Sequence, residues 1–238
     1  MILKIMKTKN LLICLLLMMP FLAKAQERDS LAIKSKYDKK LLISPYFVNA
    51  WSTFKGDNHP DYFAKPSLGV GVKADFYPLS FIGISAGIGF QQRGTGVYTP
   101  DVDKSLGNPD STHRLRMRLN CVEVPIELLL RMPRGIKGGG VRPSATVGVV
   151  VSRMFEANEF FHSVEDGFHL STDRTDSYYT SEMLMTAALG VDINAVGSIL
   201  QVHALVQSGS KNVFNDSVLY PGFDGKNLLY GVRFRISF

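Results

Sequence analysis

The chain has 238 residues, of which 45% are hydrophobic and 20% charged, with 21 glycines, 15 phenylalanines, nine tyrosines and two cysteines. This composition excludes a disordered chain, a collagen-like repeat and a small disulfide-stapled scaffold. The formal net charge of +6 would favour an anionic partner if the basic residues lay in the mature protein.

Much of that charge lies at the amino terminus. Three lysines precede a nine-residue apolar core, Leu11–Met19, and Ala23-Lys24-Ala25 has the small-x-small pattern of a cleavage site. We therefore predict a secretory signal peptide over residues 1–25. Cleavage lowers the net charge to about +2, so a nucleic-acid partner is not expected. It also removes Cys14, and a single remaining thiol, Cys121, forms neither an internal disulfide nor a zinc cluster.

Residues 26–40 are polar and predict a short leader, and residues 41–238 form the predicted folded domain. No apolar run after Lys40 approaches the 18 residues of a transmembrane helix. The pattern is instead an alternation of apolar and polar side chains, which predicts β-strands with two different faces. We expect eight strands, within Leu41–Trp51, Ser67–Tyr77, Phe81–Arg93, Cys121–Arg131, Ser144–Ser152, Glu182–Asp192, Leu200–Gln207 and Leu228–Phe238.

The predicted connections alternate in length. Three are short, and four long ones are rich in Gly, Pro, Asn, Asp and Ser. In an up-and-down barrel every second connection emerges at the same end, and this asymmetry is typical of bacterial outer-membrane barrels. The short connections are Pro78–Ser80, Pro133–Val141 and Asn194–Ser198; the long ones are Ser52–Lys65, Gly94–Arg114, Glu156–Thr180 and Ser208–Lys226.

Glycines on the polar face of the strands decide which face points outward. A soluble barrel of the lipocalin sort, or a periplasmic sheet protein, would expose that face to water, where glycines weaken strands without a packing benefit. Inside a narrow bore they leave room for long side chains. The fold class is therefore all-β: an eight-stranded antiparallel up-and-down transmembrane β-barrel with long loops at one end and short turns at the other. Glycines of this kind are Gly69, Gly71, Gly83, Gly87, Gly89, Gly148, Gly190 and Gly231.

The inward face carries five basic and five acidic side chains, and buried charges persist only when they are paired. We expect Arg233 and Arg235 to reach acids among Glu123, Glu127 and Asp192, and the lumen to be plugged. His203 is expected on this face as a hydrogen-bonded lumen residue. The predicted lumen charge network is Lys73, Asp75, Arg93, Glu123, Glu127, Arg131, Glu182, Asp192, Arg233 and Arg235.

Aromatic side chains near the predicted strand ends favour interfacial girdles. They are Phe76, Tyr77, Phe81, Phe90, Phe155, Tyr230 and Phe238. The carboxyl-terminal Tyr230, Phe234 and Phe238 alternate and end the chain, as in the signal read by the bacterial barrel-assembly machinery. Cys121-Val122-Glu123-Val124-Pro125-Ile126 and Gly231-Val232-Arg233-Phe234 resemble segments of small outer-membrane barrels of the PorT type, with Cys121 where an aromatic is usual. The resemblance implies a monomeric eight-stranded barrel, some relatives of which assist a secretion system.

Three kinds of chemistry are open in the loops. His162, Ser163, Glu165, Asp166 and His169 provide the residue types of a lipid-modifying enzyme, but their spacing is not diagnostic. His162, Asp166 and His169 alone are the candidate ligands of a metal site, and they do not define a geometry. Arg114, Arg116 and Arg118 alternate with Leu115, Met117 and Leu119 in a phase opposite to that after Val122; a bulge near Leu119–Cys121 or the lip of an extended loop would explain it. These arginines are candidates for lipopolysaccharide phosphates.

We therefore expect an outer-membrane protein of a Gram-negative bacterium, exported by its signal peptide, with a structural, binding or secretion-accessory role through its surface loops. The expected partners are membrane lipid, lipopolysaccharide and the assembly machinery. Neither cofactor, metal nor catalytic residues are predicted. A narrow channel for small solutes is the alternative, and a lipid-modifying enzyme using the third long loop is the second alternative.

Overall fold

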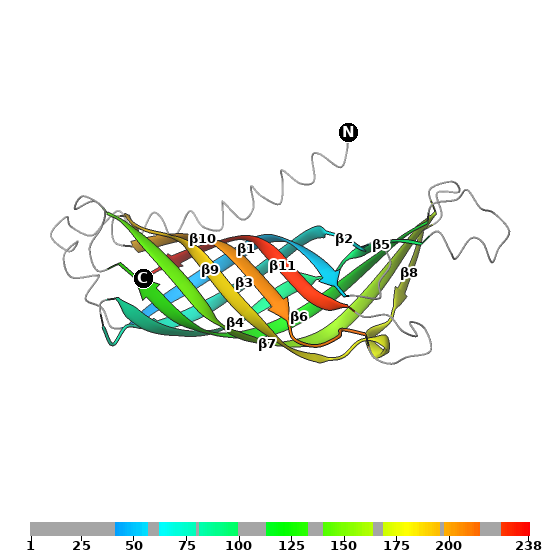
Figure 1. Cartoon of the computed structure of the whole chain (residues 1–238), viewed down its shortest axis with the longest axis horizontal. Helices are drawn as coiled ribbons and strands as arrows, with labels where there is room; N and C mark the ends of the chain where they lie inside the picture. Colours follow the sequence, from blue (N-terminus) through cyan, green and yellow to red (C-terminus); the bar gives the residue numbers. More distant parts are fainter. Residues whose placement is uncertain are drawn as a thin grey trace, which may run out of the picture.

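The computed structural model (Figure 1) describes residues 41–56, 62–79, 81–99, 113–132, 140–163, 169–195, 198–214 and 225–238. The predicted signal peptide and leader lie outside the described residues. Eight long strands dominate the fold: β1 (Leu41–Lys55), β3 (Lys65–Phe76), β4 (Ile82–Arg93), β6 (His113–Arg131), β7 (Val141–Ser163), β9 (Ser181–Ala195), β10 (Ser198–Gly209) and β11 (Lys226–Ser237). Shorter elements are β2 (Tyr62–Phe63), β5 (Gly96–Thr99), β8 (His169–Asp173) and the 3-10 helix η4 (Thr175–Ser177).

The eight long strands close into an antiparallel barrel. Each pairs with its sequence neighbours among the long strands, β1 pairs with β11, and the β6–β7 pairing completes the cylinder. The strand register shows how far the strands are shifted when the barrel closes. From Phe90, the paired residues lead through β6 and β7 to Ser181 on β9, and in the other direction through β3, β1, β11 and β10 to Val191 on β9. The two end points differ by ten residues, which is the stagger of the barrel. A stagger of this kind requires strands tilted against the barrel axis, and the tilt is plain in Figure 1. The predicted fold class is confirmed.

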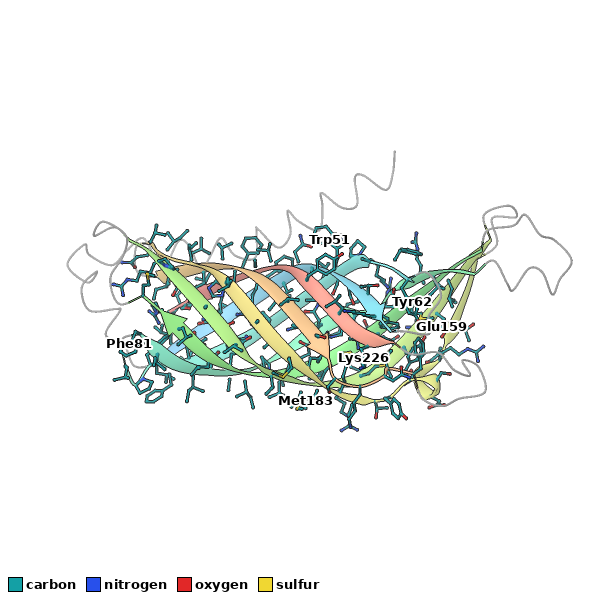
Figure 2. The ribbon with its side chains drawn as sticks, in the orientation of Figure 1. Trp51, Tyr62, Phe81, Glu159, Met183 and Lys226 are labelled. Atoms are coloured by element: carbon teal, nitrogen blue, oxygen red, sulfur yellow. The ribbon has the colours of Figure 1, made fainter. Side chains whose placement is uncertain are left out.

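The apolar face of the strands points outward. Ile84, Val124 and Phe234 expose 53%, 41% and 40% of their surface, whereas Arg233 and Glu123 are buried inside. Side chains point outward all along the wall in Figure 2. Exposed apolar side chains over the whole circumference require an apolar solvent, so this is the inside-out arrangement of a transmembrane barrel. Within the described residues, no helix is long and apolar enough to cross a membrane.

The first strand, whose facing the sequence leaves open, turns its even-numbered residues inward. Tyr46, Val48 and Ala50 pack with Ala188, Leu205 and Leu229 in one buried cluster inside the bore. Both faces of β1 are apolar because this part of the lumen is filled by aliphatic and aromatic packing.

Two glycines face inward to accommodate Tyr46. A Cβ atom built on Gly71 would lie 2.6 Å from two carbons of the Tyr46 ring, and one built on Gly89 would collide with the Tyr46 hydroxyl. Glycine therefore occurs at these positions because the ring crosses the bore directly above the backbone. Gly87 likewise leaves space for the Lys73 side chain, because a Cβ atom at this position would lie 2.7 Å from the Lys73 Cγ.

Gly89→Ala should destabilise the barrel by about 1–3 kcal/mol, because the added methyl group overpacks the space that Tyr46 fills. The cost should fall when Tyr46 is shortened to leucine in the same chain, because the two positions share one space. Urea unfolding in detergent micelles, followed by gel heat-modifiability, measures both. A fully additive double mutant would contradict the contact.

At one end the long strands are separated by five, nine and two residues, and at the other by nine, 19, 17 and 16, so the predicted asymmetry holds for all long connections except the first. The strands run further than predicted at the long-loop end. β7 continues to Ser163, eight residues into the segment predicted as a loop from Glu156, and β8 and η4 follow. β6 and β7 stay paired as far as His113 and Ser163. These strand ends, with β2, β5, β8 and η4, project beyond the barrel in Figure 1; we call them the extension. They stay ordered because they enclose an apolar core of their own, described below.

An irregularity is present near Leu119–Cys121, but it lies on β7, and for β6 the second explanation offered by the sequence, the lip of an extended loop, is confirmed. Met117, Leu119 and Cys121 are all buried, so β6 keeps the same residues inward. The extra residue is Phe155 on β7, between the partners of Asn120 and Cys121, as in a β-bulge. What changes along β6 is the chemistry of the interior, from charged in the barrel to apolar in the extension.

Candidate functional site

The lumen of the barrel holds the candidate site, a network of buried ion pairs. At its centre Glu127 accepts hydrogen bonds from Lys73 at 2.7 Å and from Arg233 at 2.6 Å. All three side chains are at most 3% exposed. Arg233 also donates to the Thr146 hydroxyl at 3.1 Å. One carboxylate thus serves two cations, and charge-assisted bonds of this length are the strong ones.

Two of the luminal arginines cross the whole bore. Arg233 on β11 and Glu127 on β6 lie four strands apart in the eight-stranded wall, directly opposite each other. Arg93 on β4 donates to Glu123 at 2.8 Å and, across the barrel, to Gln207 on β10 at 2.7 Å. These bridges occupy the diameter of the lumen at two levels.

A further pair of ionic contacts lies nearer the short turns. Arg235 contacts Asp75 at 2.9 Å and Gln201, and Arg131 approaches Asp192 to 3.5 Å. The prediction that Arg235 reaches Glu123, Glu127 or Asp192 is therefore wrong. Asp75 lies on β3, two strands from β11 through β1, and is closer to Arg235 than those acids on β6 and β9. The pairing of Arg233 with Glu127 follows the prediction.

Nine of the ten predicted luminal charges are buried, and the tenth, Glu182, is half-buried and accepts a hydrogen bond from Asn227 at 2.6 Å. Tyr77, predicted at an interface, instead points inward, where the Arg131 guanidinium lies 3.8 Å from its ring centroid. A cation over an aromatic face is a favourable contact, and it draws this ring into the lumen.

One luminal cluster has the residue types of a nucleophilic triad. Ser144 lies 2.8 Å from the His203 Nε2 and donates to the Asp192 Oδ1 at 2.6 Å; that same nitrogen lies 3.5 Å from the same oxygen. In a working triad the acid holds the other ring nitrogen, which leaves Nε2 free to take the serine proton. Here the Asp192 carboxylate accepts the hydrogen bond of the Ser144 hydroxyl directly, and the cluster is a hydrogen-bonded network. The sequence predicts that His203 faces inward, but it carries no signal that Ser144 lies beside it.

The loop residues considered for catalysis are only partly described. His162 and His169 are register partners across β7 and β8, whereas Glu165 and Asp166 lie outside the described residues. Among the residues that the structure describes, no group of three histidine, cysteine or acidic side chains is placed to hold a metal ion.

An apolar cluster closes the barrel at the long-loop end, and we call it the apolar cap. It is built from strands and loops distant in sequence: Phe54, Val97, Met117, Leu119, Cys121, Met154, Ala157, Tyr178, Val213 and Phe214. The Phe54 ring packs edge-on against Phe214 at 5.5 Å. A cavity of about 20 Å³ lies beside it, lined in part by Glu182. Sequence reasoning missed the cap, although the alternation of Leu115, Met117 and Leu119 with arginines was its signal.

Polar contacts hold the extension around the cap. Tyr178 donates to Glu159 at 2.7 Å, inside the extension. Outside, Glu156 accepts hydrogen bonds from Asn120 and Asn158, which lower the pKa of its carboxyl. The Thr175 hydroxyl and backbone N–H likewise lower the pKa of Asp173. Both carboxylates therefore stay ionised at neutral pH.

Residues 26–206 match the family described as outer membrane protein beta-barrel domain. The chain belongs to this family. The match covers most of the barrel, and members of this family are proteins of the Gram-negative outer membrane. No curated protein matches the chain.

Solved structures similar to this barrel are themselves outer-membrane proteins. OprG from Pseudomonas aeruginosa is 12% identical, with a TM-score of 0.47, over 83% of this chain and 95% of its own. Ail, the attachment invasion locus protein of Yersinia pestis, is 13% identical, with a TM-score of 0.41, over 84% of this chain and 100% of its own. The outer membrane enzyme PagL is 8% identical, with a TM-score of 0.38, over 79% and 97%.

Exposed aromatic side chains mark both edges of the membrane-facing surface of this outer-membrane barrel. Towards the extension, Trp51 stacks on Tyr230 with ring centroids 6.3 Å apart, and Phe90 lies 6.1 Å from Phe155. At the short-turn end the exposed rings are Phe76, Phe81 and Phe238. Tyr230, Phe234 and Phe238, predicted as the assembly signal, all point outward along β11. In barrels of this kind the longer loops are extracellular, so we expect the extension to lie outside the cell.

Proposed function

We propose that this protein is a closed outer-membrane barrel that acts through its extracellular extension, in a structural, binding or secretion-accessory role. The observation that carries the proposal is the double closure of the bore. Arg233 and Arg93 bridge opposite walls, and the apolar cap lies above them. Conduction through this lumen would require both layers to open.

Reconstituted into planar bilayers, the protein should show no steady openings, because ions would have to displace buried pairs. A triple variant, Arg93→Ala and Arg233→Ala with Phe214→Ala, should admit intermittent openings, because it removes both cross-bore bridges and one ring of the apolar cap. The matched control is Arg116→Ala with Arg118→Ala, which removes two exposed arginines of β6 and should stay silent. Single-channel recording distinguishes these outcomes, and steady openings of the unmodified barrel would establish the channel alternative.

The finer assignment to the PorT type, with a secretion-accessory role, belongs to the same proposal. It is supported by Glu123 and Pro125, which take the motif positions, and by the Gly231–Phe234 ending. In this barrel Glu123 holds Arg93, which gives the motif acid a structural task. Deletion of the gene, followed by comparison of secreted and surface proteins with the parent strain, tests the role; an unchanged set would refute it.

We further propose that the protein is monomeric, is exported by residues 1–25 and has no enzymatic activity. The hydrogen bonding of Ser144 supports the last point, because its proton is already committed to Asp192. Lipid turnover by the purified barrel that disappears in His162→Ala or His169→Ala would favour the enzyme instead.

A further inference from the structure

Two neighbouring strands, β1 and β11, carry an outward ladder of three cross-strand pairs at the extracellular edge of the membrane-facing surface. Trp51 is opposite Tyr230, Thr53 is opposite Leu228, and Lys55 is opposite Lys226. The aromatic and lysine side chains are exposed. Figure 2 labels Trp51 and Lys226 on this side of the barrel.

The lysine pair is unusual because like charges directly opposite each other on a sheet repel and destabilise it. Neither Lys55 nor Lys226 has an acidic partner within 4 Å in the part of the chain that the structure describes. An anion bound between the two ammonium groups would turn this repulsion into two favourable contacts.

The position of the pair indicates where that anion comes from. The stacked Trp51–Tyr230 rings lie at the membrane interface, where aromatic girdles form. Lys55 is four residues beyond Trp51, and Lys226 is four residues before Tyr230 on the antiparallel strand. At about 3.3 Å per residue this places the lysines roughly 13 Å further along the strands. The distance along the membrane normal is shorter because the strands tilt. Lysine side chains reach back towards the interface. We therefore expect the ammonium groups at the level of the lipid headgroups, above the interfacial rings of Trp51 and Tyr230.

We propose that Lys55 and Lys226, with Trp51 and Tyr230 beneath them, bind the phosphate group of an outer-leaflet glycolipid such as the lipid A part of lipopolysaccharide. The lysines hold the phosphate, and the rings contact the sugar and the first methylene groups. The site does not depend on whether the lumen conducts. It differs from the arginine rim of β6, where the Arg118 guanidinium is already occupied by the Phe160 ring at 4.8 Å.

The single tryptophan of the chain is Trp51, so its fluorescence reports on this site alone. We would titrate the folded full-length barrel in detergent with bisphosphorylated lipid A, with dephosphorylated lipid A and with inorganic phosphate. A saturable emission change is expected with the phosphorylated lipid. Dephosphorylated lipid A should bind roughly tenfold or more weakly, since each lost charge-assisted contact is a strong one, and inorganic phosphate should give no change.

Lys55→Gln with Lys226→Gln should weaken lipid binding at the Trp51 site roughly tenfold or more. The charge-matched control, Arg116→Gln with Arg118→Gln, removes the separate arginine rim three strands away and should leave the Trp51 response unchanged. Without lipid the lysine double variant should be at least as stable as the wild type, because a repulsion is removed. Equal losses in both variants would show diffuse attraction and overturn the site. Equal binding of dephosphorylated lipid would overturn the phosphate assignment, and saturation by inorganic phosphate alone would overturn the lipid assignment.

Discussion

Glu127→Leu should lower the free energy of unfolding of the barrel by about 3–5 kcal/mol, because it strands Lys73 and Arg233 as buried cations without their counter-charge. Both cations are at most 3% exposed and both contact Glu127 directly. The effect should exceed that of any single luminal substitution that removes only one ionic contact, since one carboxylate serves two partners.

Urea titration of the folded barrel in detergent, followed by its heat-modifiable migration on gels, measures this loss. Glu156→Gln is the matched control, because that half-buried carboxylate on β7 accepts hydrogen bonds from two neutral amides and no buried cation depends on it; the midpoint of this variant should stay near that of the wild type. Replacing Lys73 and Arg233 by methionine together with Glu127→Leu should recover most of the loss, because apolar groups of similar size can replace a buried ionic cluster. A wild-type midpoint for Glu127→Leu alone would show that the cluster contributes nothing.

Val124→Arg should destabilise the protein by about 2–4 kcal/mol in a lipid bilayer, the cost of an arginine on the lipid face near the midplane. Val124 points outward from the middle of β6, 41% exposed, between the two aromatic belts. The cost arises because the guanidinium must be accommodated among acyl chains, where no protein acceptor is available.

Met132→Arg provides the control for this substitution. Met132 is also exposed, at 56%, but it directly follows the end of β6 at the short-turn edge, where the cost of a charge falls to about 0–1 kcal/mol. Equilibrium unfolding from phospholipid vesicles compares the two variants directly. Similar costs at both positions would contradict the depth assignment and with it the outward facing of β6.

Much of the fold follows from alternation in the sequence. On Ser67–Tyr77 the polar series includes Lys73 and Asp75, and the apolar series includes Val70 and Val72, so one strand alone shows that its faces meet different environments. Because a residue shift of one would place every charge in lipid, facing is strongly specified. The even number of strands and the unequal loops then fix the up-and-down order, and the structure follows it.

The partners of the charges were less predictable. Arg235 pairs with Asp75 and Arg233 with Glu127, and these contacts depend on which strands lie two or four positions apart and on the ten-residue stagger of the closed barrel. The facing of β1 was also open, because the interior near Tyr46 is apolar. An alternating pattern cannot show which face of a strand points into the lumen when both faces are apolar.

The amino-acid sequence by itself determined the closed transmembrane barrel, because each strand records locally which side contacts lipid and which contacts the bore. Only the tertiary structure decided that the bore is crossed by Arg233 and Arg93 and covered by the apolar cap. It also brought Lys55 opposite Lys226. These features join residues far apart along the chain, and their proximity is set by register, tilt and closure, which no single stretch of sequence contains.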